Sequence, residues 1–469
     1  MTASIGCKEC LNNGSMKKSR TQYVCQSCGT VTPRWLGKCP ECQTWNSFVE
    51  EAEIRGEDKK RSEGPAQKPV SIGSISGSDY QRIVSGIGEF DRVMGGGIVK
   101  GGVILFAGAP GVGKSTLLLR ICDTLGQNGN KTLYVSGEES LAQIKLRADR
   151  MGVRSEQLFL LAETDADRIC ATLEVEKPAL AVVDSIQTLA TGSLESLPGN
   201  VSQVRACGYQ LTQTAKKLGI PVFLVGHMTK EGSIAGPRIL EHMVDGLILL
   251  EGDQQHIYRM LRSSKNRYGS TNEIGIFEMT GKGLMEVKNP SEYLLSQRRR
   301  DAAGSVVTIS MEGSRPLMVE VQALVATSSY GIPQRVAMGI DHKRFAILLA
   351  VLDKRLQLKT GSKDVFVSAA GGLKLIEPGV DLAVTAAVLS SAKDRIVGTR
   401  TAVFGEVGLS GELRAVPHTD QRISEAVRLG FNKIILPAAN LKKSTLKDTS
   451  MCFSADTLKD AVQQLFKEG

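Results

Sequence analysis

The chain has 469 residues, of which 42% are hydrophobic, 23% charged and 5% aromatic, and its formal net charge is +9 at pH 7. At roughly 100–200 residues per domain, this composition indicates a soluble globular protein of two to four domains. No apolar run approaches the ~18 residues that a spanning helix needs, and the N-terminus lacks the apolar core of a signal peptide, so we expect a cytoplasmic protein without membrane contact. The positive charge suits a nucleic acid partner, and equally a solvated basic surface.

Shifts in composition divide the chain into five segments. A cysteine-rich unit near the N-terminus is followed by a charged stretch with Pro, Gly and Ser that is typical of a linker. Short apolar runs then alternate with helix-like segments, which indicates a mainly parallel sheet with helices on both faces, and a second α/β unit follows. The predicted segments are an extension (1–20), the cysteine unit (21–50), the linker (51–75), the first α/β domain (76–287) and the second (288–469).

The cysteine unit predicts a metal site. Two Cys-x2-Cys pairs lie ten residues apart, and four thiolates in two such turns suit tetrahedral Zn²⁺. Four protein ligands close the site, so we expect it to be structural and to supply the folding free energy of so small a unit. We expect Trp35 and Trp45 to pack its core, and assign no metal to the earlier pair, Cys7 and Cys10. The expected zinc ligands are Cys25, Cys28, Cys39 and Cys42.

A phosphate-binding loop stands in its usual setting between a strand and a helix. Val103–Ala107 is a short apolar run, a G-x-x-x-x-G-K-[ST] sequence follows, and Leu117 lies in a helical pattern. The glycines let backbone N–H groups surround phosphates, and Lys114 can reach the β- and γ-phosphates of ATP. The expected nucleotide-binding residues are Gly108, Ala109, Pro110, Gly111, Val112, Gly113, Lys114, Ser115 and Thr116.

Two acidic positions complete the expected hydrolytic site. Asp184 ends the apolar run Leu180–Val183 and is expected to hold Mg²⁺ together with the Ser115 hydroxyl; an Asp that caps the next turn is the alternative. Glu138 follows a strand expected beside the phosphate strand and is the first choice to orient the attacking water, with Glu139 second. The alternative is an acid pair that favours the dipole of the following helix.

A third strand ends near His227. Its imidazole would be placed to sense the γ-phosphate, or is a histidine satisfied within the core.

The segment Lys265-Asn266-Arg267-Tyr268-Gly269, together with the glycines before the phosphate loop, resembles the RadA (Sms) family of bacterial DNA repair proteins, within the RecA-like ATPases. The resemblance covers about residues 20–469. It implies a RecA-like P-loop ATPase core with an N-terminal four-cysteine zinc finger and a C-terminal Lon-protease-like α/β domain. By similarity, Lys265 and Arg267 are expected to act in catalysis on a neighbouring subunit's γ-phosphate; a solvated basic turn is the alternative.

Two loops would face DNA by the same resemblance. They span Thr188–Val204 and Lys230–Arg238, and Lys230 and Arg238 are the expected DNA-binding side chains. Neither loop contains an aromatic residue, so base stacking is not expected. A flexible surface loop is the alternative for each.

The second α/β domain resembles the proteolytic domain of Lon, in which a serine and a lysine form the catalytic pair. Asp381 occupies the place of that serine, and the lysine position falls at about Arg422. A carboxylate and a guanidinium cannot replace a nucleophile and its base, so we expect no peptidase activity. Arg315, Lys343 and Arg344 are loose candidates for a basic surface that faces DNA.

Together these features predict a DNA-dependent ATPase of recombinational repair that uses ATP, Mg²⁺ and Zn²⁺. The family resemblance implies a homo-hexameric ring that binds single-stranded and branched DNA and promotes branch migration as a translocase, with recombinase or helicase partners. The alternatives are a KaiC-like ATP-dependent regulatory scaffold and, less favoured because the serine and lysine are missing, an ATP-dependent protease.

Overall fold

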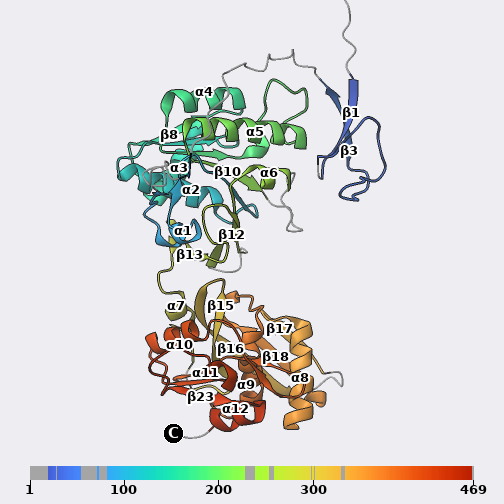
Figure 1. The fold of residues 1–469 in the computed structure, drawn as a ribbon, viewed down its shortest axis with the longest axis vertical. Helices are drawn as coiled ribbons and strands as arrows, with labels where there is room; N and C mark the ends of the chain where they lie inside the picture. The colour runs from blue at the N-terminus through green and yellow to red at the C-terminus, as the bar shows by residue number, and fades with distance from the viewer. Residues whose placement is uncertain are drawn as a thin grey trace, which may run out of the picture.

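The computed structural model shows two α/β bodies and a small N-terminal ribbon beside the first of them (Figure 1). No helix among the residues that it describes is long and apolar enough to cross a membrane. The described residues are 20–27, 29–53, 71–72, 82–227, 238–252, 258–296, 298–299, 301–328 and 333–466.

The first body is a nine-stranded sheet covered by helices on both faces. The strand order is β14-β13-β12-β11-β6-β10-β9-β7-β8, with β11 to β8 parallel and β12 to β14 antiparallel. The strands are β6 (Val103–Gly108), β7 (Thr132–Ser136), β8 (Leu158–Ala162), β9 (Leu180–Asp184), β10 (Val222–His227), β11 (Gly246–Glu251), β12 (Tyr258–Asn266), β13 (Ile274–Thr280) and β14 (Gly283–Glu286). The helices are α1 (Gly88–Val93), α2 (Lys114–Gln127), α3 (Leu141–Met151), α4 (Ala166–Glu176), α5 (Val201–Leu218) and α6 (Arg238–Met243). A short pair, β4 (Arg82–Ile83) and β5 (Ile98–Val99), precedes β6.

Each face of this sheet has its own core, which is why its central strands are apolar at every position. In β6, Ile104 and Phe106 pack with one cluster, whereas Leu105 and Ala107 pack with the other. Successive side chains of a strand point to opposite faces, so a strand covered on both sides buries all of them.

The position of β7 differs from the prediction. The sequence predicts β7 beside the phosphate strand β6, but β10 and β9 lie between them. Crossovers within a parallel sheet can place strands that follow one another in sequence several positions apart, and the apolar pattern carries no information on that order.

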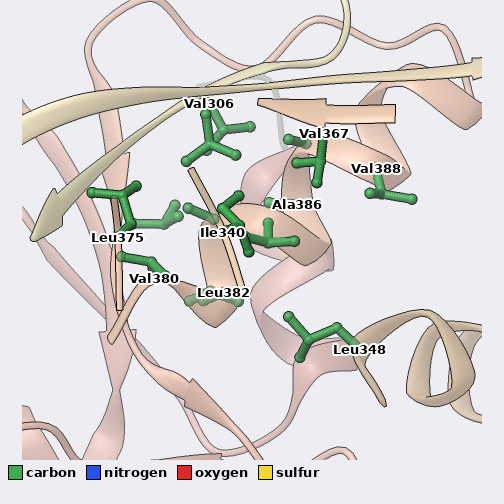
Figure 2. Packing of buried hydrophobic residues seen from close by; sticks show 14 of the residues in the cluster. Val306, Ile340, Leu348, Val367, Leu375, Val380, Leu382, Ala386 and Val388 are labelled. Carbon is green, nitrogen blue, oxygen red and sulfur yellow. The ribbon is translucent and has the colours of Figure 1, made fainter. Parts of the chain in front are cut away.

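The second body is a seven-stranded sheet of order β17-β18-β16-β15-β19-β22-β23, with the small pair β20-β21 beside it. Figure 2 shows its core, in which Val306 and Val367 of the sheet pack near Leu382, Ala386 and Val388 of α9. Its strands are β15 (Ser305–Glu312), β16 (Arg315–Thr327), β17 (Arg335–Met338), β18 (Lys363–Ala369), β19 (Thr401–Val403), β20 (Glu406–Val407), β21 (Leu413–Arg414), β22 (Lys433–Pro437) and β23 (Cys452–Ala455). Its helices are α7 (Pro290–Ser296), α8 (His342–Leu356), α9 (Asp381–Ala392), α10 (Thr419–Arg428), α11 (Ala438–Leu441) and α12 (Leu458–Leu465).

Polar contacts connect the two bodies. Arg315 of β16 forms an ion pair with the buried Glu89 of α1, and the backbone N–H of Ser314 donates to the carbonyl of Asn272 at 2.9 Å. Arg315, one of the loose candidates for a DNA-facing surface, is therefore engaged in an internal contact.

The ribbon is a three-stranded sheet of order β2-β1-β3, made of β1 (Arg20–Cys25), β2 (Val31–Thr32) and β3 (Phe48–Glu53). The expectation that Trp35 and Trp45 fill its core is wrong, because they are 51% and 68% exposed. The small interior is formed instead by Cys25, Cys39 and Phe48, and Tyr23, Leu36 and Cys42 pack against them.

Candidate nucleotide and metal sites

The phosphate-binding loop joins β6 to α2 at the carboxyl edge of the sheet. Gly111 and Gly113 have φ of +77° and +111°, in the region that favours glycine, and Gly113 directly precedes α2. A Cβ at Gly113 would also lie 2.8 Å from the Leu284 side chain. The loop thus places unpaired N–H groups of the helix start beside a glycine turn, which is the arrangement that binds phosphate.

Lys114 lies inside this loop rather than in solvent. Its ammonium group donates to the carbonyls of Gly108 at 2.9 Å and Ala109 at 3.1 Å, and it lies 3.2 Å from Nδ1 of His227. Burial lowers the pKa of Lys114, and the nearby charges of Asp184 and Glu138 partly oppose this. A cation held among weak carbonyl acceptors is available to a phosphate that offers stronger, charged ones.

Glu138 lies at the same edge and is linked to Lys114 through one histidine. Its Oε1 atom accepts from the Ser185 hydroxyl at 2.5 Å and lies 3.3 Å from Nε2 of His227. Glu139 instead points to Arg147, with a closest N–O distance of 2.7 Å. The geometry therefore distinguishes the two glutamates: the first faces the phosphate loop and the second forms an ion pair with α3.

Asp184 ends β9 and is 7% exposed. The hydroxyl of Tyr134, which is fully buried, donates to its Oδ2 atom at 2.5 Å. Burial, and after it the Asp184 charge, raise the pKa of Tyr134 well above its usual value, so the phenol stays protonated and remains a donor. Sequence reasoning missed Tyr134, because an aromatic residue in an apolar strand is normally only core.

The donors and acceptors at this edge fit a magnesium nucleotide. Magnesium prefers oxygen ligands, and Ser115 and Asp184 offer a hydroxyl and a carboxylate beside the glycine loop. Gly108 also lies so close to the Leu250 carbonyl that a Cβ would approach it to 2.5 Å. Only glycine therefore fits at the start of the phosphate-binding loop.

Lys265 and Arg267 lie at the opposite end of the sheet. Lys265 donates to the carbonyls of Glu241 and Val244 at 2.6 and 2.9 Å, and Arg267 contacts Asp245 at 3.2 Å. Asp245 accepts from the N–H of Val103, which begins β6, whereas the phosphate loop follows the end of that strand. At ~3.3 Å per residue, the strand β6 that separates Asp245 from the phosphate loop is about 17 Å long.

The ribbon brings three of the four predicted metal ligands together. The sulfur atoms of Cys25, Cys39 and Cys42 lie within 4.8 Å of one another, and those of Cys25 and Cys42 are 3.7 Å apart. Tetrahedral thiolates around zinc at ~2.3 Å would stand about 3.8 Å apart. Cys28, the fourth predicted ligand, lies outside the described residues, as do Cys7 and Cys10.

The loops expected to face DNA are described only in part. Lys230 and the side chain of Arg238 lie outside the described residues. The first loop leaves β9, and the ribbon contacts its far end, where Gln26 Oε1 accepts from the N–H of Val201 at the start of α5. Both amide atoms of Gln187, near the start of this loop, are buried without a hydrogen-bond partner in the described part of the chain.

The two positions predicted to correspond to the Lon catalytic pair lie in separate ion pairs. Arg344 Nε lies 3.0 Å from Oδ1 of the buried Asp381, and the N–H of Val407 donates to the same carboxylate at 3.1 Å. Arg422 is fully buried and pairs with Glu377 at 2.6 Å. Arg344, like Arg315, therefore forms an internal ion pair. Lys343, the third candidate for a surface that faces DNA, is exposed.

The sheet, the loop and the acidic edge define a P-loop nucleoside triphosphatase of the RecA-like α/β class with an N-terminal metal-binding ribbon. Residues 78–233 match the family described as AAA domain, and residues 23–50 match the one described as rubredoxin metal binding domain.

Full-length relatives identify the family. The chain is 50% identical to the DNA repair protein RadA of Bacillus subtilis, over 91% of this chain and 94% of the relative. It is 49% identical to the protein of the same name from Aquifex aeolicus, over 90% and 94%. A KaiC-like protein from Pyrococcus horikoshii is similar at 21% identity, covering 44% of this chain and 99% of that one, with a TM-score of 0.38. The chain belongs to the RadA family of DNA repair proteins, and it contains an ATPase domain.

Proposed function

We propose that this protein is a DNA-dependent ATPase that binds single-stranded DNA and promotes branch migration of recombination intermediates. The observation that carries the proposal is the linked set Lys114, His227, Glu138 and Ser185 at the edge from which the Thr188–Val204 loop leaves the sheet. A change at the phosphates can thereby alter the contacts at the base of a DNA-facing loop.

The positions of the side chains support the following hydrolytic roles. The loop of residues 108–116 binds the phosphates, and Lys114 exchanges its carbonyl partners for the β- and γ-phosphates. Ser115 and Asp184 hold Mg²⁺, which when bound neutralises charge that develops on the phosphate oxygens. Glu138 orients the attacking water, because its carboxylate faces the loop while that of Glu139 does not.

The distance of Lys265 and Arg267 from their own phosphate loop supports a role on another subunit. Cations at one end of a subunit can meet the nucleotide at the edge of the next if the subunits form a ring, and a hexamer is the proposed assembly. In such a ring, Lys265 and Arg267 stabilise the charge of the transition state across the interface.

The remaining parts have supporting roles in this proposal. The ribbon holds Zn²⁺ through Cys25, Cys28, Cys39 and Cys42, and Lys230 and Arg238 contact the DNA backbone. The second body is a Lon-like scaffold for the ring without peptidase activity, since the Asp381 carboxylate is engaged by Arg344. Recombinase or helicase proteins are the proposed protein partners.

The decisive experiment measures ATP turnover with and without single-stranded DNA at several salt concentrations. We expect stimulation by DNA that weakens as salt rises, because cations that neutralise phosphates release counterions. The variant Lys114→Ala controls for contaminating ATPases. Turnover that is unaffected by DNA at every salt concentration would contradict the proposal and favour a KaiC-like regulatory scaffold.

A further inference from the structure

Tyr134 contacts Asp184, one of the two side chains that are proposed to hold magnesium. It lies in β7, and its hydroxyl reaches across to Asp184 at the end of the neighbouring strand β9. The phenol is fully buried and Asp184 is 7% exposed, so this hydrogen bond lies away from solvent. The carboxylate of the metal-side strand is thus held by a side chain of its neighbouring strand.

The chemistry of the two groups fixes the direction of this hydrogen bond. A phenol has one hydrogen to donate, and a carboxylate can only accept. The Tyr134 hydrogen therefore points to Asp184 Oδ2, which leaves the other carboxylate oxygen, Oδ1, to face a metal ion.

We propose that Tyr134 is a positioning residue for the magnesium site, which holds the Asp184 carboxylate through Oδ2 so that Oδ1 faces the ion. The inference rests on the proposed role of Asp184. A phenylalanine at this position would fill the same space in the core, but it would leave Asp184 Oδ2 without its donor. The carboxylate would then be free to rotate away from the ion.

The test measures binding of a fluorescent ATP analogue to the full-length chain over a range of Mg²⁺ concentrations and in EDTA. We expect Tyr134→Phe to bind as the unaltered protein does in EDTA, but to need about tenfold more Mg²⁺ for half-maximal enhancement, since a lost hydrogen bond to a charged group weakens affinity by about that factor. The matched control is Tyr293→Phe, which removes a hydroxyl that contacts Glu278 at 3.4 Å, away from the site. Binding of Mn²⁺, followed by electron paramagnetic resonance, should weaken in parallel.

A third variant separates the failure of this inference from the failure of the proposed function. If Asp184→Asn keeps the Mg²⁺ enhancement, the assignment of Asp184 to the metal is wrong. If Asp184→Asn loses the enhancement while Tyr134→Phe keeps the unaltered Mg²⁺ requirement, only the role of Tyr134 is overturned. Should Tyr134→Phe fail to fold, fluorine NMR of protein labelled with fluorotyrosine gives the same decision: the Tyr134 resonance should shift when Mg²⁺ is added to the nucleotide-bound protein, and an unmoved resonance contradicts the inference.

Discussion

The ammonium group of Lys114 lies 3.2 Å from Nδ1 of His227 and close to two carbonyls of its own loop. Replacing Lys114 with alanine removes the cation that is proposed to bind the phosphates. We expect Lys114→Ala to lower the rate of ATP hydrolysis at least about a hundredfold, because a single positioned donor to developing charge contributes that much. Lys131→Ala, which removes a lysine paired with Glu176 at the surface, should keep its activity. Near-normal turnover by Lys114→Ala would contradict the assignment of the phosphate loop.

The two adjacent glutamates provide a matched pair. We expect Glu138→Gln to lower kcat about 10²- to 10⁴-fold with nucleotide affinity retained, because an amide cannot accept a proton from water. Glu139→Gln weakens only a partly exposed ion pair with Arg147 and should leave kcat within about twofold. Steady-state kinetics and nucleotide binding measured on both variants decide the assignment. Equal losses of kcat in the two variants would show that neither glutamate has a specific role in orienting the attacking water.

Arg267 should matter for hydrolysis without affecting nucleotide binding. We expect Arg267→Ala to lose most of the DNA-stimulated hydrolysis, at least about a hundredfold, since a cation supplied by a neighbouring subunit contributes that much or more. The Arg267 side chain is 54% exposed, and the buried Asp245 carboxylate keeps Lys216 as a partner at 3.2 Å, so the loss of this contact should change stability little. Arg299→Ala, at an exposed position, is the control. A variant that behaves like the unaltered protein would exclude a role across the interface.

Metal removal should act on the ribbon alone. We expect Cys42→Ser or a strong chelator to release one zinc ion per chain, measured by atomic absorption, and to unfold the ribbon, because metal binding supplies its folding free energy. Cys122→Ser, at a buried thiol of the ATPase core, should keep the metal. A full metal content in Cys42→Ser would contradict the proposed ligand set.

Asp381→Ala should change stability but not proteolysis. The ion pair with Arg344 is buried on the carboxylate side and 31% exposed on the other. We therefore expect a loss of about 1–3 kcal/mol in the free energy of unfolding of the second body, below the ~3–5 kcal/mol of a fully buried pair. Asp149→Ala, in an exposed pair, should cost less than about 1 kcal/mol. ATP-stimulated cleavage of casein by the unaltered protein, lost in Asp381→Ala, would overturn the view that this domain has no peptidase activity.

Features that depend on neighbours in sequence could be predicted. A local pattern predicts the strand before Gly108 and the helix after Lys114, and the structure contains both. Asp184 stands at the end of an apolar strand as predicted, because four buried residues followed by a carboxylate leave few other arrangements.

Contacts between distant segments could not be predicted in the same way. The strand order, which separates β7 from β6, depends on crossovers that the apolar pattern does not encode. Asp381 forms an ion pair with Arg344 of α8, and the sequence pattern does not indicate this, because the pair forms only when α8 packs against α9. The role proposed for Tyr134 could not be predicted for the same reason. Its hydrogen bond to Asp184 joins β7 to β9, and two helices lie between these strands in the sequence.

The sheet of the ATPase body places its phosphate loop at one end and Lys265 and Arg267 at the other. If hydrolysis needs the phosphate loop of one chain and the two cations of another, an isolated chain has no complete active site. It carries one part of each of two different active sites. Turnover per chain should then rise steeply with protein concentration at dilute conditions and level off once assembly is complete. A mixture of Lys114→Ala and Arg267→Ala chains should regain part of the lost activity, because some interfaces would combine an intact half from each.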